Sequence, residues 1–222
     1  MVSGSAVEVF ERKLLVHCSP VIAGLKPANM FSCPIQCTPR CGSARCASLS
    51  LLGFLTALEV CSSRLLPADV HIAVLAQREK GMLLLVYRPG LLHDAVNEPR
   101  AAAFLRALGY EPCDVHRCIA TLSQRIARSD AAAKHERRCL FPHEVGLFLG
   151  YPYDDVRGFM DNAGQDCLAS GCWKVYARER DAADCFCRYK QCTRDCRAAY
   201  ERGAALAELA ARGRDVAMGR AA

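Results

Sequence analysis

The sequence has no apolar run long enough to cross a membrane. A spanning helix needs about 18 or more consecutive apolar residues, and the best stretches, residues 49–58 and 82–87, are shorter. The N-terminal apolar run 14–25 is interrupted by His17 and Pro20 and follows acidic residues, whereas a signal peptide has a basic segment before an unbroken apolar one. We therefore expect a cytoplasmic protein with no membrane span and no signal peptide.

Three further motifs are missing. The sequence contains neither a P-loop nor a dinucleotide-binding glycine fingerprint, so nucleotide-dependent chemistry has no support. A zinc-protease helix needs a second histidine four residues after His143, and Leu147 occupies that position. The 29 basic and 23 acidic residues give a net charge of +6 but are dispersed along the chain, so a nucleic-acid partner is not expected.

Apolar residues and cysteines are abundant instead. The 222 residues are 52% hydrophobic, which is enough for one sizeable domain. The 15 cysteines remain below the share of about 8–10% that marks short disulfide scaffolds. Because the chain is not short and the count is odd, we expect mainly reduced thiols, many of which fill the core as small apolar groups.

The apolar pattern predicts an α+β fold. Two apolar runs, 70–76 and 82–87, flank a polar connection that contains Gly81, which indicates a β-hairpin. Segments 14–21 and 173–176 are the other expected strands. Helices are expected at residues 46–58, 100–108, 115–127 and 141–150, in a second short helix that begins at Pro152, and from Asp181 onward.

These elements predict a single domain over residues 1–213. Its small mixed or antiparallel sheet of about four strands would be covered by helices, and a C-terminal helix would complete it. The polar segment 129–138 is expected to be a mobile linker, and residues 214–222 a frayed tail.

Several separated motifs resemble one bacterial family. They are Phe-Pro-His-Glu-Val-Gly-Leu-Phe-Leu-Gly-Tyr-Pro at 141–152, Asp-Val-Arg-Gly-Phe at 155–159, Gly-Cys-Trp-Lys-Val-Tyr at 171–176, His-Cys-Ser-Pro at 17–20 followed by Lys26, Asn29 and Phe31, and Val-Tyr-Arg-Pro at 86–89. Together they resemble the "domain of unknown function 3793" family over about residues 14–203. The resemblance implies a bacterial, mostly anaerobe-associated intracellular protein without an assigned reaction. The chain departs from the family pattern at Ala163, where a basic residue is common, and in its extra cysteines between 33 and 46.

The first functional hypothesis is an enzyme or small-ligand-binding protein. Its candidate catalytic residues are His17, Cys18, Lys26, His143 and Glu144, and its candidate ligand-binding residues are Asn29, Arg88, Lys174 and Tyr176. A neighbouring histidine or lysine cation lowers the pKa of a thiol and favours the nucleophilic thiolate. The alternatives stay open: a packing or turn role for Cys18, a helix-capping role for Glu144, and an exposed strand face for Lys174 and Tyr176.

A second hypothesis is a thiol-rich metal or redox protein. Cys33, Cys37, Cys41 and Cys46 lie on a Pro-rich loop, where thiolates can bind Zn²⁺ or an iron–sulfur cluster. Their spacing matches neither the paired two-residue gaps of zinc ribbons nor the spacing of radical S-adenosylmethionine enzymes, so free thiols or adventitious disulfides are the alternative. A later set, Cys185, Cys187, Cys192 and Cys196, mostly follows a helical stripe and is expected to pack in the core.

A third hypothesis is an adaptor that presents the helical pair 141–159 to a protein partner. An exposed apolar patch there would favour it. The pair also has the outline of a DNA-binding helix–turn–helix, but its second helix carries Asp154, Asp155 and Asp161 against Arg157 alone. Such a helix would bring net negative charge to phosphates, which argues against DNA.

Overall fold

The computed structural model describes residues 5–36, 49–135 and 141–219. The chain divides into two compact units, one formed by Met1–Arg88 with Cys192–Ala222 and the other by Pro89–Gln191. Helices and strands both contribute, so the predicted α+β class is confirmed. Helix α8 (Glu179–Glu201) supplies residues to both units.

A four-stranded sheet forms the centre of the first unit. Its strands are β1 (Ala28–Gln36), β2 (Leu49–Ser50), β3 (His71–Arg78) and β4 (Gly81–Tyr87), in the order β2-β1-β4-β3. β1 pairs with β2 in parallel and with β4 antiparallel, which makes the sheet mixed, as predicted. The predicted hairpin is also confirmed, and its strands β3 and β4 are antiparallel neighbours.

Gly81 opens strand β4 at a very close approach to β1. Its φ of +150° lies in the region that favours glycine, and a Cβ there would be 2.1 Å from the carbonyl oxygen of Cys33. The register pairs Pro34 with Gly81. A glycine at this position therefore lets β1 and the hairpin turn meet.

The predicted strand at 14–21 is wrong, because these residues belong to helix α1 (Ala6–Ile22). Phe10, Leu14 and Cys18 recur at helical spacing and are fully buried. Pro20 lies inside the last turn and cannot donate to the carbonyl of Val16, but Val16 is on the exposed side of the helix. Ser5 begins the helix by accepting a hydrogen bond from the backbone N–H of Glu8.

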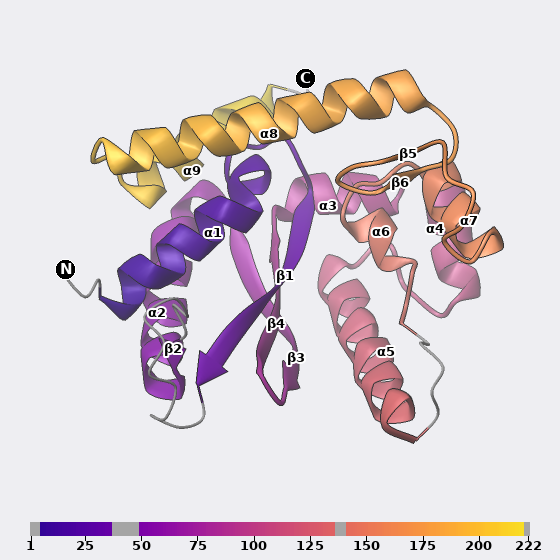
Figure 1. The fold of residues 1–222 in the computed structure, drawn as a ribbon, viewed down its shortest axis with the longest axis horizontal. Helices are drawn as coiled ribbons and strands as arrows, with labels where there is room; N and C mark the ends of the chain where they lie inside the picture. The colour runs from indigo at the N-terminus through magenta and orange to yellow at the C-terminus, as the bar shows by residue number, and fades with distance from the viewer. Residues whose placement is uncertain (1–4, 37–48, 136–140, 220–222) are drawn as a thin grey trace. The chain divides into compact units, whose positions relative to one another are not determined.

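Helices α1 and α2 (Leu51–Leu65) contact each other and the sheet (Figure 1). Alternate residues of the strands, among them Phe31, Cys33, Leu84 and Val86, join both helices in one apolar core. The one-turn helix η1 (Leu66–Ala68) follows α2, so α2 ends before Pro67 as predicted.

The other side of α2 is apolar and exposed at Leu51, Leu52 and Leu55. The window Leu51–Ala68 is 18 residues long with a mean hydropathy of 1.3, and 28% of it is buried. By length and composition alone this segment is therefore able to span a membrane, a test that core helices of soluble proteins also pass. The sequence-based expectation of no membrane span stays a prediction.

Helix α9 (Leu206–Met218) closes the first unit. Residues 214–218, which the sequence predicts to be part of a frayed tail, lie in this helix. Gly213 lets α9 approach the end of α1, since a Cβ there would be 2.0 Å from the carbonyl oxygen of Ile22.

The second unit contains α3 (Pro89–Val96), α4 (Pro99–Ala107), α5 (Val115–His135), α6 (Val145–Phe148) and α7 (Tyr153–Asp161). Strands β5 (Ala169–Ser170) and β6 (Lys174–Val175) form a separate antiparallel pair. The prediction that 173–176 belongs to the larger sheet is therefore wrong. Residues 129–135 extend α5 instead of forming a linker, and residues 136–138 lie outside the described residues.

Candidate ligand pocket

The segment 141–161 forms a very short helix, a turn and a longer helix. The first predicted helix is only the single turn α6, and α7 starts directly after Pro152 as predicted. Gly150 makes the turn with φ of +73°. At Gly146 a Cβ would lie 2.8 Å from Val156, so this glycine lets α6 and α7 pack closely.

Asp155 of α7 fixes the position of Trp173. Its carboxylate is buried, and it accepts hydrogen bonds from the Trp173 indole Nε1 at 2.7 Å and from the backbone N–H groups of Tyr176 at 2.7 Å and Ala177 at 3.0 Å. Hydrogen bonds to a charged acceptor are the stronger kind. One carboxylate thus ties the 173–177 segment to α7.

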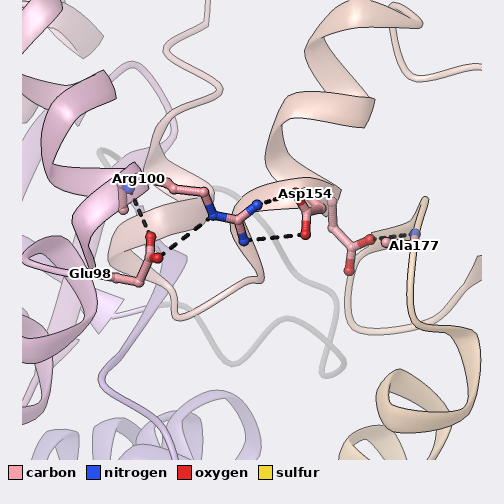
Figure 2. A network of polar contacts seen from close by, with 6 residues as sticks. Glu98, Arg100, Asp154 and Ala177 are labelled. Atoms are coloured by element: carbon pink, nitrogen blue, oxygen red, sulfur yellow. Dashed lines mark hydrogen bonds and ion pairs between the residues drawn. The ribbon is translucent and has the colours of Figure 1, made fainter.

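A second polar network ties α7 to α4. Figure 2 shows Arg100 between Glu98 and Asp154, with its guanidinium directed at both carboxylates. Arg100 Nη1 donates to Asp154 at 2.7 Å, and Glu98 caps α4 by accepting from the backbone N–H of Ala101. These groups are about half exposed, so the ion pairs define orientation more than they stabilise the unit.

Residues of the segments 143–159 and 170–174 line a pocket of about 310 Å³. Its walls are largely aromatic: Tyr151 and Trp173 stack with ring centroids 4.9 Å apart, and His143 lies against Phe159 at the same separation. Its aromatic, charged and polar lining residues include His143, Tyr151, Asp155, Phe159, Trp173 and Lys174. All belong to the second unit.

Lys174 supplies the positive charge of the pocket. Its Nζ donates to the carbonyl oxygen of Gly164 at 2.5 Å, which also anchors the loop after α7. Tyr176, the other ligand candidate on this strand, does not line the pocket: its hydroxyl donates to the carbonyl oxygen of Gln165, and its ring lies where a Cβ at Gly158 would be. Both side chains therefore hold the same loop.

His143 and Glu144 have different surroundings. The His143 ring lines the pocket, and among the described residues neither ring nitrogen has a hydrogen-bond partner. Glu144 is buried, and its Oε1 accepts from Arg125 Nε at 2.5 Å and from the Tyr110 hydroxyl at 2.9 Å. The structure shows no capping hydrogen bond from the Glu144 side chain to α6, so the predicted capping role is wrong.

Four of the candidate residues lie in the first unit near the end of α1 and the start of β1. They are His17, Cys18, Lys26 and Asn29. The buried Lys26 donates from Nζ to Asn29 Oδ1 at 2.6 Å, and Asn29 Nδ2 donates to the backbone carbonyl of His17 at 2.8 Å. The His17 ring stacks on Phe31 with centroids 4.8 Å apart. These hydrogen bonds stabilise the turn in which the chain passes from α1 to β1.

Cys18 is a poor nucleophile in this environment. It is fully buried, and that burial raises the pKa of its thiol, although the Lys26 ammonium and the Asn29 amide act in the opposite direction. Partial burial and the neighbouring Lys13 lower the pKa of His17. Cys18 therefore remains a neutral thiol in the core near neutral pH.

Arg88, a predicted ligand residue, is directed at the backbone. Its guanidinium is 2% exposed and donates to the carbonyl oxygens of Val21 at 2.8 Å, Ala68 at 2.7 Å, Ile22 at 2.7 Å and Ala210 at 3.0 Å. Burial lowers its pKa from the ordinary value, and Asp69 opposes the shift. These bonds satisfy carbonyls at the ends of α1 and η1 and one carbonyl of α9.

The predicted cysteine metal loop lies mostly outside the described residues. Cys37, Cys41 and Cys46 belong to 37–48, and only Cys33 is described, buried in β1 with its pKa raised by that burial. In residues 5–36, 49–135 and 141–219 no group of three or more His, Cys, Asp or Glu side chains is placed to hold a metal ion. The loop hypothesis stays a prediction.

The adaptor hypothesis gains no support from the helical pair. Residues 145–149 are all buried, and among the described residues the large apolar side chains with strong exposure lie outside 141–159. An apolar docking patch is therefore not formed by this pair.

Asp155 and Trp173 line the pocket but were not among the candidates predicted from the sequence. From the sequence, Asp155 is one of the acidic residues that argue against DNA binding, and Trp173 belongs to an expected strand. The available signal was that both lie inside the family motifs, yet nothing in their spacing shows that an indole 18 residues away donates to this carboxylate.

The fold and site together describe an α+β protein with a mixed sheet in one unit and an aromatic pocket built from short motifs in the other. The chain belongs to the family of proteins of unknown function DUF3793, whose sequence profile matches residues 14–210. Neither curated proteins nor solved structures gave a match.

Proposed function

We propose that this protein binds a small, planar, largely apolar molecule that carries an acidic group, in the pocket of the second unit. The observation that carries the proposal is the meeting of aromatic walls with His143 and Lys174 in one cavity. A volume of about 310 Å³ is at the lower end of the range for small-molecule sites, roughly 300–1,000 Å³.

The aromatic walls favour a planar ligand. Tyr151, Phe159 and Trp173 line the pocket, and a flat apolar molecule packed against aromatic rings gains both dispersion and burial. Asp155 holds Trp173 in position before a ligand arrives, so little ordering is required on binding.

The charges favour an acidic group on the ligand. Lys174 is positively charged, and His143 has a ring N–H without a partner among the described residues. The lining also contains a carboxylate, Asp155, whose oxygens already accept three hydrogen bonds and so are engaged with the protein's own donors.

Binding accounts for the geometry better than nucleophilic catalysis does. Glu144 accepts from Tyr110 and Arg125 and does not line the pocket, so it is not available as a partner for His143. Cys18 is a buried thiol with a raised pKa, which removes the simplest nucleophile of the sequence-based hypothesis.

The test uses Trp173, the single tryptophan of the chain, as an energy donor. Anilinonaphthalene sulfonate has a flat apolar naphthalene ring and an acidic sulfonate, and its emission is sensitised when it binds within energy-transfer range of the indole. We expect saturable sensitised emission, and we expect Lys174→Gln to weaken binding about 10-fold, as loss of a charged hydrogen bond implies.

Two controls distinguish binding in the pocket from non-specific binding of the dye. Lys190→Gln removes an exposed lysine of the same unit and should leave the affinity unchanged. N-phenyl naphthylamine lacks the sulfonate and should bind wild type and Lys174→Gln alike. The proposal is refuted if Lys174→Gln and Lys190→Gln bind anilinonaphthalene sulfonate with equal affinity. It is also refuted if no sensitised emission is seen at a saturating concentration of the dye.

A further inference from the structure

The thiols of Cys192 and Cys196 form a close pair on helix α8, in the part of the helix that belongs to the first unit. Their sulfur atoms are 4.0 Å apart on consecutive turns. Cys196 is 9% exposed within the core and Cys192 is half-buried, so the pair reaches from the apolar interior towards the surface.

A disulfide does not suit this pair. Side chains four residues apart on a helix have Cβ atoms about 5–6 Å apart, whereas a disulfide needs about 3.5–4.5 Å. Oxidation would therefore require local unwinding of α8. Two thiols that are in contact but cannot close a bond remain available to bridge a third atom.

A single metal ion fits between the sulfurs. At a metal–sulfur distance of about 2.3 Å, two thiolates lie about 3.8 Å apart in tetrahedral geometry and at most about 4.6 Å apart in linear geometry. The separation of 4.0 Å falls inside this interval. Binding thus requires small side-chain rotations and no change of the helix.

The number of ligands selects the metal. A structural Zn²⁺ site needs four protein ligands, and among the described residues no cluster of even three suitable side chains exists. Soft thiolates favour Cu(I), which accepts two of them. We propose that Cys192 and Cys196 form a two-thiolate site for a soft monovalent ion of the Cu(I) type.

The proton balance is simple. Each thiol releases its proton to solvent, two sulfur–metal bonds form, and no electron is transferred. The contact between the two sulfurs lowers the pKa of one thiol, Cys196, and raises the pKa of the other, Cys192.

The experiment titrates reduced protein anaerobically with Cu(I) from its bicinchoninate complex. We expect Cys192→Ser and Cys196→Ser each to lower the affinity of one Cu(I) equivalent by about 100-fold or more, because the chelate is lost. Cys187→Ser, which removes an exposed thiol of the same helix, should leave that equivalent intact. Circular dichroism checks that each variant is folded. If a serine variant is not folded, Cys192→Ala takes its place in the titration.

Alkylation by iodoacetamide, mapped on each cysteine by mass spectrometry, identifies which thiols bind the metal. The site is supported if Cu(I) protects Cys192 and Cys196 from alkylation with one common midpoint in the titration. It is supported further if Cu(I) no longer protects Cys196 in the Cys192→Ser variant. The proposal is overturned if the two thiols are protected separately or not at all, or if the serine variants bind every equivalent as tightly as wild type.

Discussion

Replacing Arg88 by lysine should destabilise the protein strongly. The guanidinium donates four hydrogen bonds to carbonyls of three separate segments, and it is almost fully buried. An ammonium group keeps the charge but lacks the planar fork that reaches several acceptors at once. Two or more of the carbonyls would then lose their donor.

The structure gives the magnitude. A hydrogen bond that involves a charged group contributes about 1.5–3 kcal/mol, so the loss of two lowers the free energy of unfolding by about 3–6 kcal/mol. With a urea dependence of about 2 kcal/mol per molar, the unfolding midpoint should fall by roughly 1.5–3 M. That is a large part of the about 5–15 kcal/mol that stabilises a typical protein.

Urea unfolding of Arg88→Lys, followed by circular dichroism in reducing buffer, measures this shift. Arg12→Lys is the matched control: its guanidinium is about half exposed and pairs with Glu8 on the surface, so its midpoint should barely change. If Arg88→Lys unfolds within about 0.3 M of wild type, the guanidinium does not hold the helix ends as inferred.

Two other substitutions test the second unit. Ala163 has φ of +49°, a conformation that costs a residue with a Cβ about 1–2 kcal/mol. Glycine removes this cost but loses about 0.4–1 kcal/mol through the larger entropy of the unfolded chain. The net gain of roughly 0.5–1 kcal/mol should raise the melting temperature of Ala163→Gly by about 1–4 °C, and a lower melting temperature would contradict the left-handed backbone at this position. Asp155→Asn replaces one acceptor oxygen by an amide donor, which should lower the free energy of unfolding by about 2–3 kcal/mol and shift the emission of Trp173 to the red. Unchanged emission would mean that the indole is positioned by packing alone.

The hairpin was predictable because its signals are local. Two apolar runs and a connection containing Gly81 lie within 18 residues, and the structure pairs them as β3 and β4. Helix α1 was missed although Leu14, Cys18 and Val21 have helical spacing, because Pro20 normally marks the end of a helix. The helix tolerates it since Val16, which loses its hydrogen-bond donor, is on the exposed side.

The candidate site was less predictable because its contacts are distant in sequence. Glu144 accepts from Tyr110, which is 34 residues away, and no local pattern distinguishes such a partner from a helix cap. Arg88 has the residue type of a ligand-binding group, but its acceptors include a carbonyl 122 residues later in the chain. The motifs identified important residues, while their roles depend on partners that only the folded chain brings together.

The single tryptophan has a consequence for how the cooperativity of the chain is measured. Because Trp173 lies in the second unit, a fluorescence transition follows the unfolding of Pro89–Gln191 alone. The circular dichroism of the helices follows both units. Coincidence of the two transitions is a criterion for two-state unfolding, so one unlabelled sample reports whether the two units unfold as a single thermodynamic system.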